Sequence, residues 1–599
     1  AAAGTDLAAT LDRAIAAAET SLREGEPQTA ESHYRSALLE GWLLMGALER
    51  LDGRMAEARE AFGRAAASAV ENRPALQALA LTHLQMGEAV PAEQILTSLA
   101  RKNPKDVLTR RLLAQSLAAS GKPERAVQEL EEARATAPAD LELAFALAGE
   151  YLALKKPELA ARLFRQIVEA RPIPQTHVLI GRTYRDSGEY ERARAELETA
   201  LKQDARVRHA HTYLGDVIVA EKGRAGLEQA VPEYEAELAL APQDPLANLG
   251  LGMALVDTQR SEEALAPLTI AARSVPPEPR TLYYLGRAQL GVNHPAEAVA
   301  SLKRALELIE KQAGSGDQLR VIHNQLGQAL RDLGQTQEAA VHFAESERLS
   351  AKGADAAREW IARHTADVAE PGAATTGMRP VIEAPALAQL SPSERQGLER
   401  RVSAALARAY LNLGVLQVQA ERFARGAELF EKAAVVDPHF PRVQSSLGIA
   451  YFNDGQFDKA AEALSRALAA DPQDGGLKRM LAMAWLNTKA YDKAADLLKD
   501  DPELGANPSL QFAYGLALVK SDHAAEAERI FASLLARHGD SAELSVLLGQ
   551  AHAQQGDFDA AVEALKHALA LNAGVAEAHA TLGVIYQRQG RLAEAEEAL

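Results

Sequence analysis

The sequence predicts an all-α fold, an α-solenoid of stacked helical hairpins arranged in two blocks. Three observations lead to this prediction. A small residue, followed twelve positions later by alanine, returns about every 34 residues through almost the whole chain. Apolar residues between these positions follow helical spacing. Prolines recur where the second helix of a unit has to end. Aromatic residues make up only 5% of the chain, and nothing in the pattern indicates strands.

Each unit is predicted to hold two antiparallel helices, called helix A and helix B below. The small residue lies on helix A and the alanine on helix B, so that the two helices can approach closely. A larger residue four places after the alanine, such as Phe62 or Phe430, fills the space toward the next unit. The small positions are Ala18, Gly46, Ala80, Ala114, Ala148, Gly181, Gly215, Gly252, Gly286, Gly327, Gly414, Gly448, Ala482, Gly515, Gly549 and Gly583.

Proline is predicted to end helix B, because it lacks an N–H and disfavours helix in the preceding residue. The prolines in this place are Pro104, Pro138, Pro172, Pro242, Pro438 and Pro472. A single hairpin cannot bury its apolar faces alone, so neighbouring hairpins must stack into a solenoid.

The unit at residues 443–472 carries Leu447, Gly448, Tyr451, Ala460, Leu464, Ala467 and Pro472. This spacing resembles the tetratricopeptide repeat. The resemblance implies a right-handed superhelix with helix A residues on its concave wall, where ligands of the family usually bind, and helix B residues on its convex wall.

Three regions are expected along the chain. Residues 1–350 form a first block of about ten repeats, and residues 391–599 form a second block of about six, the last one incomplete. Residues 351–390 form a capping helix near 354–365, with Trp360 on its apolar face, and a linker rich in Pro and Gly. The linker is either a solvated connector or a segment that lies in a groove or acts as a hinge. Because the last repeat stops within helix B, we expect the natural polypeptide to continue beyond Leu599.

Composition narrows the classes of function. A net charge of −17 and a pI near 5.5 argue against nucleic-acid binding, which needs a basic surface. No apolar run is long enough to cross a bilayer. The absence of cysteine excludes disulfides, thiolate metal sites and cysteine nucleophiles. It also favours a periplasmic or extracellular protein over a cytoplasmic one, although the compartment stays open.

No catalytic residue, cofactor or metal site is predicted. Gly121-Lys122 is followed by proline and cannot form a phosphate-binding loop, and the Gly250-Leu-Gly252 stretch lies within a helix A. His209 and His211 are two residues apart, so they point to different sides of a helix.

The candidate binding residues are those on helix A that face the groove in the family. In the first block they are mostly polar and basic, and they predict capture of an acidic partner segment unless the arginines pair with nearby acids. These are Arg111, Arg182, Arg185, Arg280, Tyr283, Arg287, Asn324, Gln328 and Arg331. In the second block they are mostly apolar, and they predict capture of an apolar segment unless tight coiling buries them. These are Leu411, Val415, Ile449, Phe452, Met483, Phe512 and Leu516.

The leading interpretation is a non-enzymatic scaffold, typical of bacteria, that binds partner polypeptides in the groove. One alternative is the repeat region of a larger enzyme of the glycosyltransferase kind. Another is the periplasmic arm of an exopolysaccharide or outer-membrane export apparatus. Self-association through the uncapped last repeat is a further possibility.

Overall fold

The computed structural model describes residues 8–68, 72–273, 278–311, 316–350 and 385–599. Every regular element in these residues is helical, which confirms the predicted all-α repeat fold. The predicted capping helix with Trp360 lies outside them, as does most of the predicted linker. None of the helices in the described ranges is both long and apolar enough to span a membrane.

The chain divides into two compact units. One unit holds residues 1–76 together with residues 383–599, and the other holds residues 77–382. The compact units therefore differ from the two predicted repeat blocks. By repeat order residues 1–76 belong to the first block, but in the structure they pack with the second block.

The first unit contains a short N-terminal group of helices and the whole second block. Its helices are α2 (Ala9–Arg23), α3 (Pro27–Leu51), α4 (Met55–Ser68), α22 (Pro385–Ala388), α23 (Pro392–Gln419), α24 (Phe423–Val436), α25 (Val443–Asn453), α26 (Phe457–Ala470), α27 (Gly475–Asn487), α28 (Tyr491–Leu498), α29 (Pro508–Lys520), α30 (Ala524–His538), α31 (Ala542–Gln555), α32 (Phe558–Leu571), α33 (Ala576–Arg588) and α34 (Leu592–Ala598).

The second unit contains the rest of the first block and begins within α5 (Arg73–Gln85). Its other helices are α6 (Ala89–Lys102), α7 (Val107–Ala119), α8 (Pro123–Thr136), α9 (Leu141–Ala153), α10 (Pro157–Ala170), α11 (Pro174–Asp186), α12 (Tyr190–Gln203), α13 (Ala210–Lys222), the 3-10 helix η1 (Gly223–Gly226), α14 (Leu227–Leu240), α15 (Pro245–Asp257), α16 (Ser261–Ala271), α17 (Pro279–Gly291), α18 (Pro295–Lys311), α19 (Gly316–Asp332) and α20 (Thr336–Ser350).

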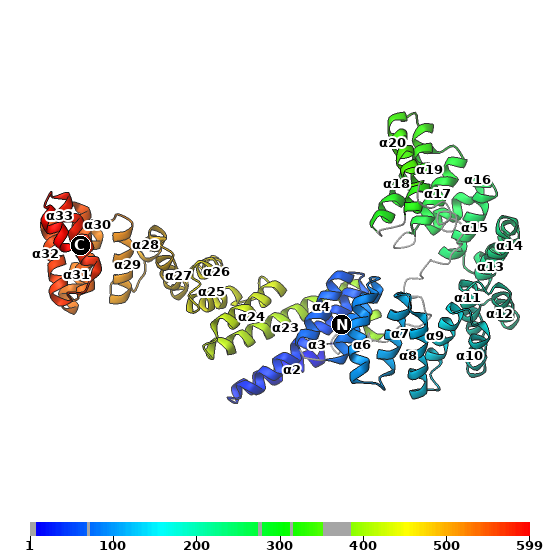
Figure 1. The fold of residues 1–599 in the computed structure, drawn as a ribbon, viewed down its shortest axis with the longest axis horizontal. Coiled ribbons are helices and arrows are strands. Elements are labelled where there is room, and N and C mark those ends of the chain that lie inside the picture. Colours follow the sequence, from blue (N-terminus) through cyan, green and yellow to red (C-terminus); the bar gives the residue numbers. More distant parts are fainter. Residues whose placement is uncertain (1–7, 69–71, 274–277, 312–315, 351–384) are drawn as a thin grey trace. The chain divides into compact units, whose positions relative to one another are not determined.

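Within each unit, helices that follow one another in the chain mostly lie side by side (Figure 1). Helix A of one repeat also contacts helix A of the next, as in α11 with α13, α13 with α15, α23 with α25 and α25 with α27. The A helices of consecutive repeats therefore form a continuous layer, called the A-helix wall below.

The repeat register is as the sequence predicts. A Cβ added at Gly448 would lie 2.5 Å from Leu464 of the facing helix B, so only glycine permits this approach. At Gly215 the facing residue is Tyr234, 2.8 Å from an added Cβ and three places later than usual, because η1 lengthens the turn. The small residue on helix A is thus required by contact with a large side chain on helix B.

Helix ends also follow the predicted signals. The helices before Pro104, Pro138, Pro172, Pro242, Pro438 and Pro472 all end two residues before the proline. At the start of the second block, Ser391 and Glu394 form a capping box, with Pro392 at the first helical position.

The N-terminal helices pack directly on α23. Trp42 of α3 donates from Nε1 to the hydroxyl of Tyr410 at 2.9 Å, and Asn412 donates from Nδ2 to the hydroxyl of Tyr34 at 2.9 Å. Both tyrosines and the tryptophan are buried. An added Cβ at Gly41 would lie 2.6 Å from Leu406, so α3 and α23 meet at close range.

Ion pairs flank this contact. Arg401 pairs with Asp12, and Arg408 Nη2 lies 2.6 Å from Glu19 Oε1, so that α2 is held to α23 by two pairs. The start of the second block is therefore covered by the first helices of the chain, an arrangement that the repeat spacing does not predict.

Candidate partner-binding surfaces

Three of the predicted arginines connect neighbouring helices of the A-helix wall in the second unit. Arg111 of α7 pairs with Glu142 of α9. Arg287 Nη1 of α17 lies 2.8 Å from Asp257 Oδ1, the last residue of α15. The third, Arg185, is described next. Each of these ion pairs joins two neighbouring repeats. It also occupies the guanidinium group that would otherwise bind a carboxylate of a partner.

Arg185 is part of a buried network. Its Nη1 lies 2.5 Å from Asp216 Oδ2 on α13, and its guanidinium carbon lies 4.6 Å from the centre of the Tyr213 ring. Asp216 Oδ1 accepts a hydrogen bond of 2.9 Å from the hydroxyl of Tyr234. Burial raises the pKa of Tyr234 well above its ordinary value, so the hydroxyl stays protonated and continues to donate.

Arg280 and Tyr283 are also buried. The Arg280 side chain is 2% exposed, and its Nη2 lies 3.0 Å from Glu278 Oε1. Arg185, Arg280 and Tyr283 therefore present almost no surface to a partner in this conformation.

The other predicted polar residues of this wall reach solvent to different degrees. The Arg331 side chain is 59% exposed, with its Nε 3.9 Å from Asp332. The Arg182 side chain is 20% exposed, with its Nε 3.8 Å from Asp186. Asn324 is exposed and Gln328 is half-buried. Among the predicted polar residues, these four are the accessible ones that do not pair across repeats; the Arg287 and Arg111 side chains are 25% and 19% exposed but pair with a neighbouring A helix.

The predicted apolar residues of the second block lie on four consecutive A helices of the first unit. Leu411 is buried on α23. The other six are called the apolar stripe below, because each pair of neighbouring A helices that carries them is in contact. They are Val415 of α23, Ile449 and Phe452 of α25, Met483 of α27, and Phe512 and Leu516 of α29.

The side chains of the apolar stripe are partly exposed and partly packed against the core. Val415 is 38% exposed and Met483 is 39% exposed, and the other four are half-buried. Phe512 and Leu516 pack on one side against the core of their repeats. A row of partly exposed apolar side chains on a rigid helical layer matches what an apolar partner segment requires.

Two asparagines at the edge of the stripe are absent from the predicted set. Asn453 and Asn487 are exposed at the ends of α25 and α27, and each donates from Nδ2 at 2.8 Å to a backbone oxygen, that of Ile449 or of Met483. The sequence could have identified them, because both asparagines occupy the same position of two successive repeats, directly after the last helix A position that faces the groove.

One acid on the A-helix wall of the second unit has an unusual environment. Burial raises the pKa of the Glu150 carboxyl on α9 from 4.5 to about 7. Nothing in the repeat pattern distinguishes Glu150 from a solvated acid, so the sequence does not predict this environment.

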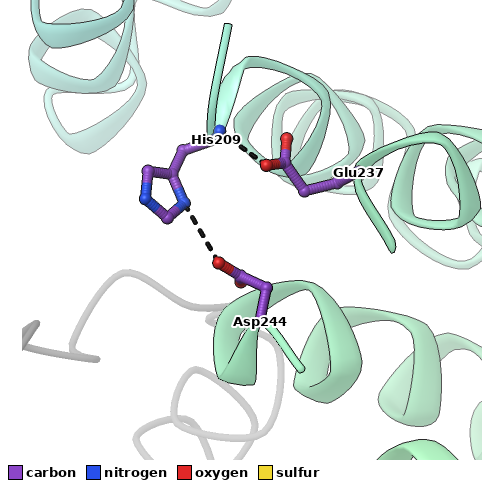
Figure 2. Close-up of side chains that lie close together, drawn as sticks. All are labelled: His209, Glu237 and Asp244. Atoms are coloured by element: carbon purple, nitrogen blue, oxygen red, sulfur yellow. Dashed lines mark hydrogen bonds and ion pairs between the residues drawn. The ribbon is translucent and has the colours of Figure 1, made fainter. Parts of the chain in front are cut away.

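The histidine at the start of α13 lies in a cluster with two carboxylates (Figure 2). His209 Nδ1 is 3.5 Å from Asp244 Oδ2, and the His209 backbone N–H donates to Glu237 Oε1 at 2.8 Å. The possible ligand atoms of the three residues lie within 4.8 Å of one another, so they are close enough to hold a metal ion. Arg208, however, already places its guanidinium 2.7 Å from Asp244 and 3.3 Å from Glu237.

This cluster is best explained by its place between helices. Glu237 holds the backbone at the start of α13, where His209 has a left-handed φ of 67°. Asp244 caps α15 by accepting from the Ala247 N–H at 3.0 Å. Glu237 thus fixes the turn before α13 and Asp244 the turn before α15, while Arg208 pairs with both carboxylates.

Comparison with known proteins matches the repeats themselves. Family models described as tetratricopeptide repeat match residues 417–475, 452–514, 518–566 and 552–599 in one case, and residues 111–172, 178–226 and 220–279 in the other. No curated protein matches the chain. The models match repeats only, and no catalytic domain is identified.

Several solved structures are similar to part of the chain. MamA AMB-1 is 26% identical, with a TM-score of 0.26, and covers 28% of this chain and 93% of its own. YrrB, described as a TPR protein with an unusual peptide-binding site, is 21% identical, with a TM-score of 0.27, and covers 31% of this chain and 94% of its own. MamA from Desulfovibrio magneticus RS-1 is 19% identical, with a TM-score of 0.26, and covers 30% of this chain and 97% of its own.

Proposed function

Because the chain belongs to the tetratricopeptide repeat family, we propose that it is a non-enzymatic scaffold that binds protein partners on its A-helix walls. Proteins of stacked helical repeats generally use such extended surfaces for binding. The observation that carries the proposal is the apolar stripe, which leaves partly exposed apolar side chains on four consecutive A helices.

The stripe favours an apolar partner segment, either an amphipathic helix or an extended peptide. Burying a partly exposed valine or methionine against such a segment removes apolar surface from water, at roughly 25 cal/mol per Å². Asn453 and Asn487 at its edge supply amide groups that can bind a peptide backbone.

The A-helix wall of the second unit favours an acidic segment. Arg182 and Arg331 keep part of their guanidinium surface accessible, and Asn324 and Gln328 lie on the same wall. The arginines that pair across repeats hold the wall in shape, so recognition in this unit falls to the accessible residues.

Affinity capture with variants that introduce negative charge tests the proposal. Val415→Glu combined with Met483→Glu places two carboxylates on the apolar stripe at its most exposed positions. We expect this variant to lose the proteins that wild type retains from an extract, as identified by mass spectrometry. The matched control is Val435→Glu, because Val435 is 65% exposed on the B helix α24 and should not contribute.

Circular dichroism must show equal helix content in all three proteins. Retention of the same partners by the double variant, with its helices intact, would contradict the proposed role of the stripe.

A further inference from the structure

Two histidines face each other across the last described hairpin of the second unit. The Nδ1 atom of His323 on α19 lies 2.9 Å from the Nδ1 atom of His342 on α20. The two ring centres are 5.1 Å apart, with 30° between the ring planes. His323 is buried and His342 is half-buried.

Each imidazole has a ring nitrogen that can act as a metal ligand when it carries a free lone pair. A hydrogen bond between two Nδ1 atoms needs one ring to donate and the other to accept. Moving the donor's proton to its Nε2 atom leaves two Nδ1 lone pairs on adjacent helices, without any net loss of a proton.

The separation of the two nitrogens fits a metal ion with donors at right angles. Metal–imidazole bonds of about 2.0 Å place two such donors about 2.8 Å apart at 90° and about 3.3 Å apart in a tetrahedron. We propose that His323 and His342 form a two-histidine site for a divalent transition-metal ion with tetragonal preference, of which Cu²⁺ binds most strongly in the first-row series.

Charged groups of both signs act on the pair. Glu345 lies on α20, three residues after His342, and its carboxylate acts on His323. Glu338 lies one turn before His342 and is held by Lys303 at 2.8 Å, while Arg348 Nε holds Glu345 at 2.8 Å. Glu310 also acts on His323. Glu345 itself pairs with the exposed Arg348.

A bound ion would join α19 to α20 in place of a single hydrogen bond. Metal binding of this kind stabilises the hairpin that holds both ligands. The cluster of His209 with Glu237 and Asp244 differs in this respect, because Arg208 already occupies the position of a cation there.

Titration of the untagged full-length chain with CuCl₂ tests the site. The chain has 15 histidines, so weaker surface binding is expected in every variant, and glycine in the buffer competes for it. Wild type should bind one equivalent more than His323→Ala or His342→Ala. The electron paramagnetic resonance spectrum of the tightest site should show coupling to two nitrogens. The control His294→Ala removes an exposed histidine, and it should bind as many Cu²⁺ ions as wild type and show the same spectrum.

Thermal unfolding is a second measurement, and it does not depend on the number of ions bound at weaker surface sites. One equivalent of Cu²⁺ should raise the unfolding temperature of wild type and His294→Ala, but not that of His342→Ala, whose half-buried ring can be removed with little loss of packing. Equal stoichiometry and an equal thermal shift in wild type and His342→Ala would overturn the proposal.

Discussion

At the scale of single residues, the same residue type has two roles in this protein. Arg185 is buried and bound to Asp216, whereas the Arg331 side chain is 59% exposed at an equivalent place on the wall. Arg185 finds its acid on the neighbouring A helix α13, whereas Arg331 lies on α19, the last A helix of the second unit within the described residues. Replacing the buried member of such a pair removes a charge partner in the interior, which costs several kcal/mol, about 3–5 for a pair that is fully buried.

Glu150 gives a pH-dependent prediction at this scale. Its pKa is about 7 in the fold and 4.5 ordinarily, so the folded state favours the protonated carboxyl. This contribution to stability is fully present below pH 4.5 and is lost as the pH rises to about 7. Glu150→Gln should therefore raise the unfolding temperature at pH 8 and have a smaller effect at pH 5. The control Glu169→Gln changes an exposed acid on α10 and should leave the pH dependence as it is in wild type.

At the scale of helices, the first hairpin of the chain packs on the first helix of the second block. Trp42 and Tyr410 each stand four places before the small residue of their repeat, Gly46 or Gly414. In the sequence they therefore appear as ordinary repeat residues, yet in the structure they bind one another. The exposed ion pairs between α2 and α23 add little stability on their own but fix which surfaces meet.

Engineered cysteines test this contact cleanly, because the chain has no cysteine of its own. Asp12→Cys with Arg401→Cys replaces an ion pair between α2 and α23 whose residues are 389 positions apart. A short bismaleimide cross-linker, which spans the gap left by the two longer side chains, should close this loop within one molecule and increase mobility on a denaturing gel. The pair Asp12→Cys with Lys459→Cys, in which Lys459 is exposed on α26, should not form the loop. Absence of the internal cross-link in the first pair, or only cross-linked dimers, would refute the contact.

At the scale of the whole molecule, the sequence predicts the features that recur from repeat to repeat and does not predict contacts that occur only once. Repeat register and helix ends at proline follow from local rules that recur along the chain, and the cap at Ser391 follows from a local motif. The contact between α3 and α23 and the pairing of His323 with His342 depend on side chains brought together by stacking, and neither carries a periodic signal. The apolar stripe lies between these two cases. Its residues follow from the repeat spacing, whereas their exposure depends on how the repeats coil.

The most direct test of the account asks whether a partner covers the apolar stripe. Val415→Cys and Met483→Cys each introduce the only thiol of the chain, and Val435→Cys introduces one on the B helix α24. The rate of alkylation is then measured with and without the partner identified by affinity capture. The account predicts that the partner slows alkylation at positions 415 and 483 and leaves position 435 unchanged. Unchanged rates at 415 and 483, or equal protection at all three positions, would contradict it.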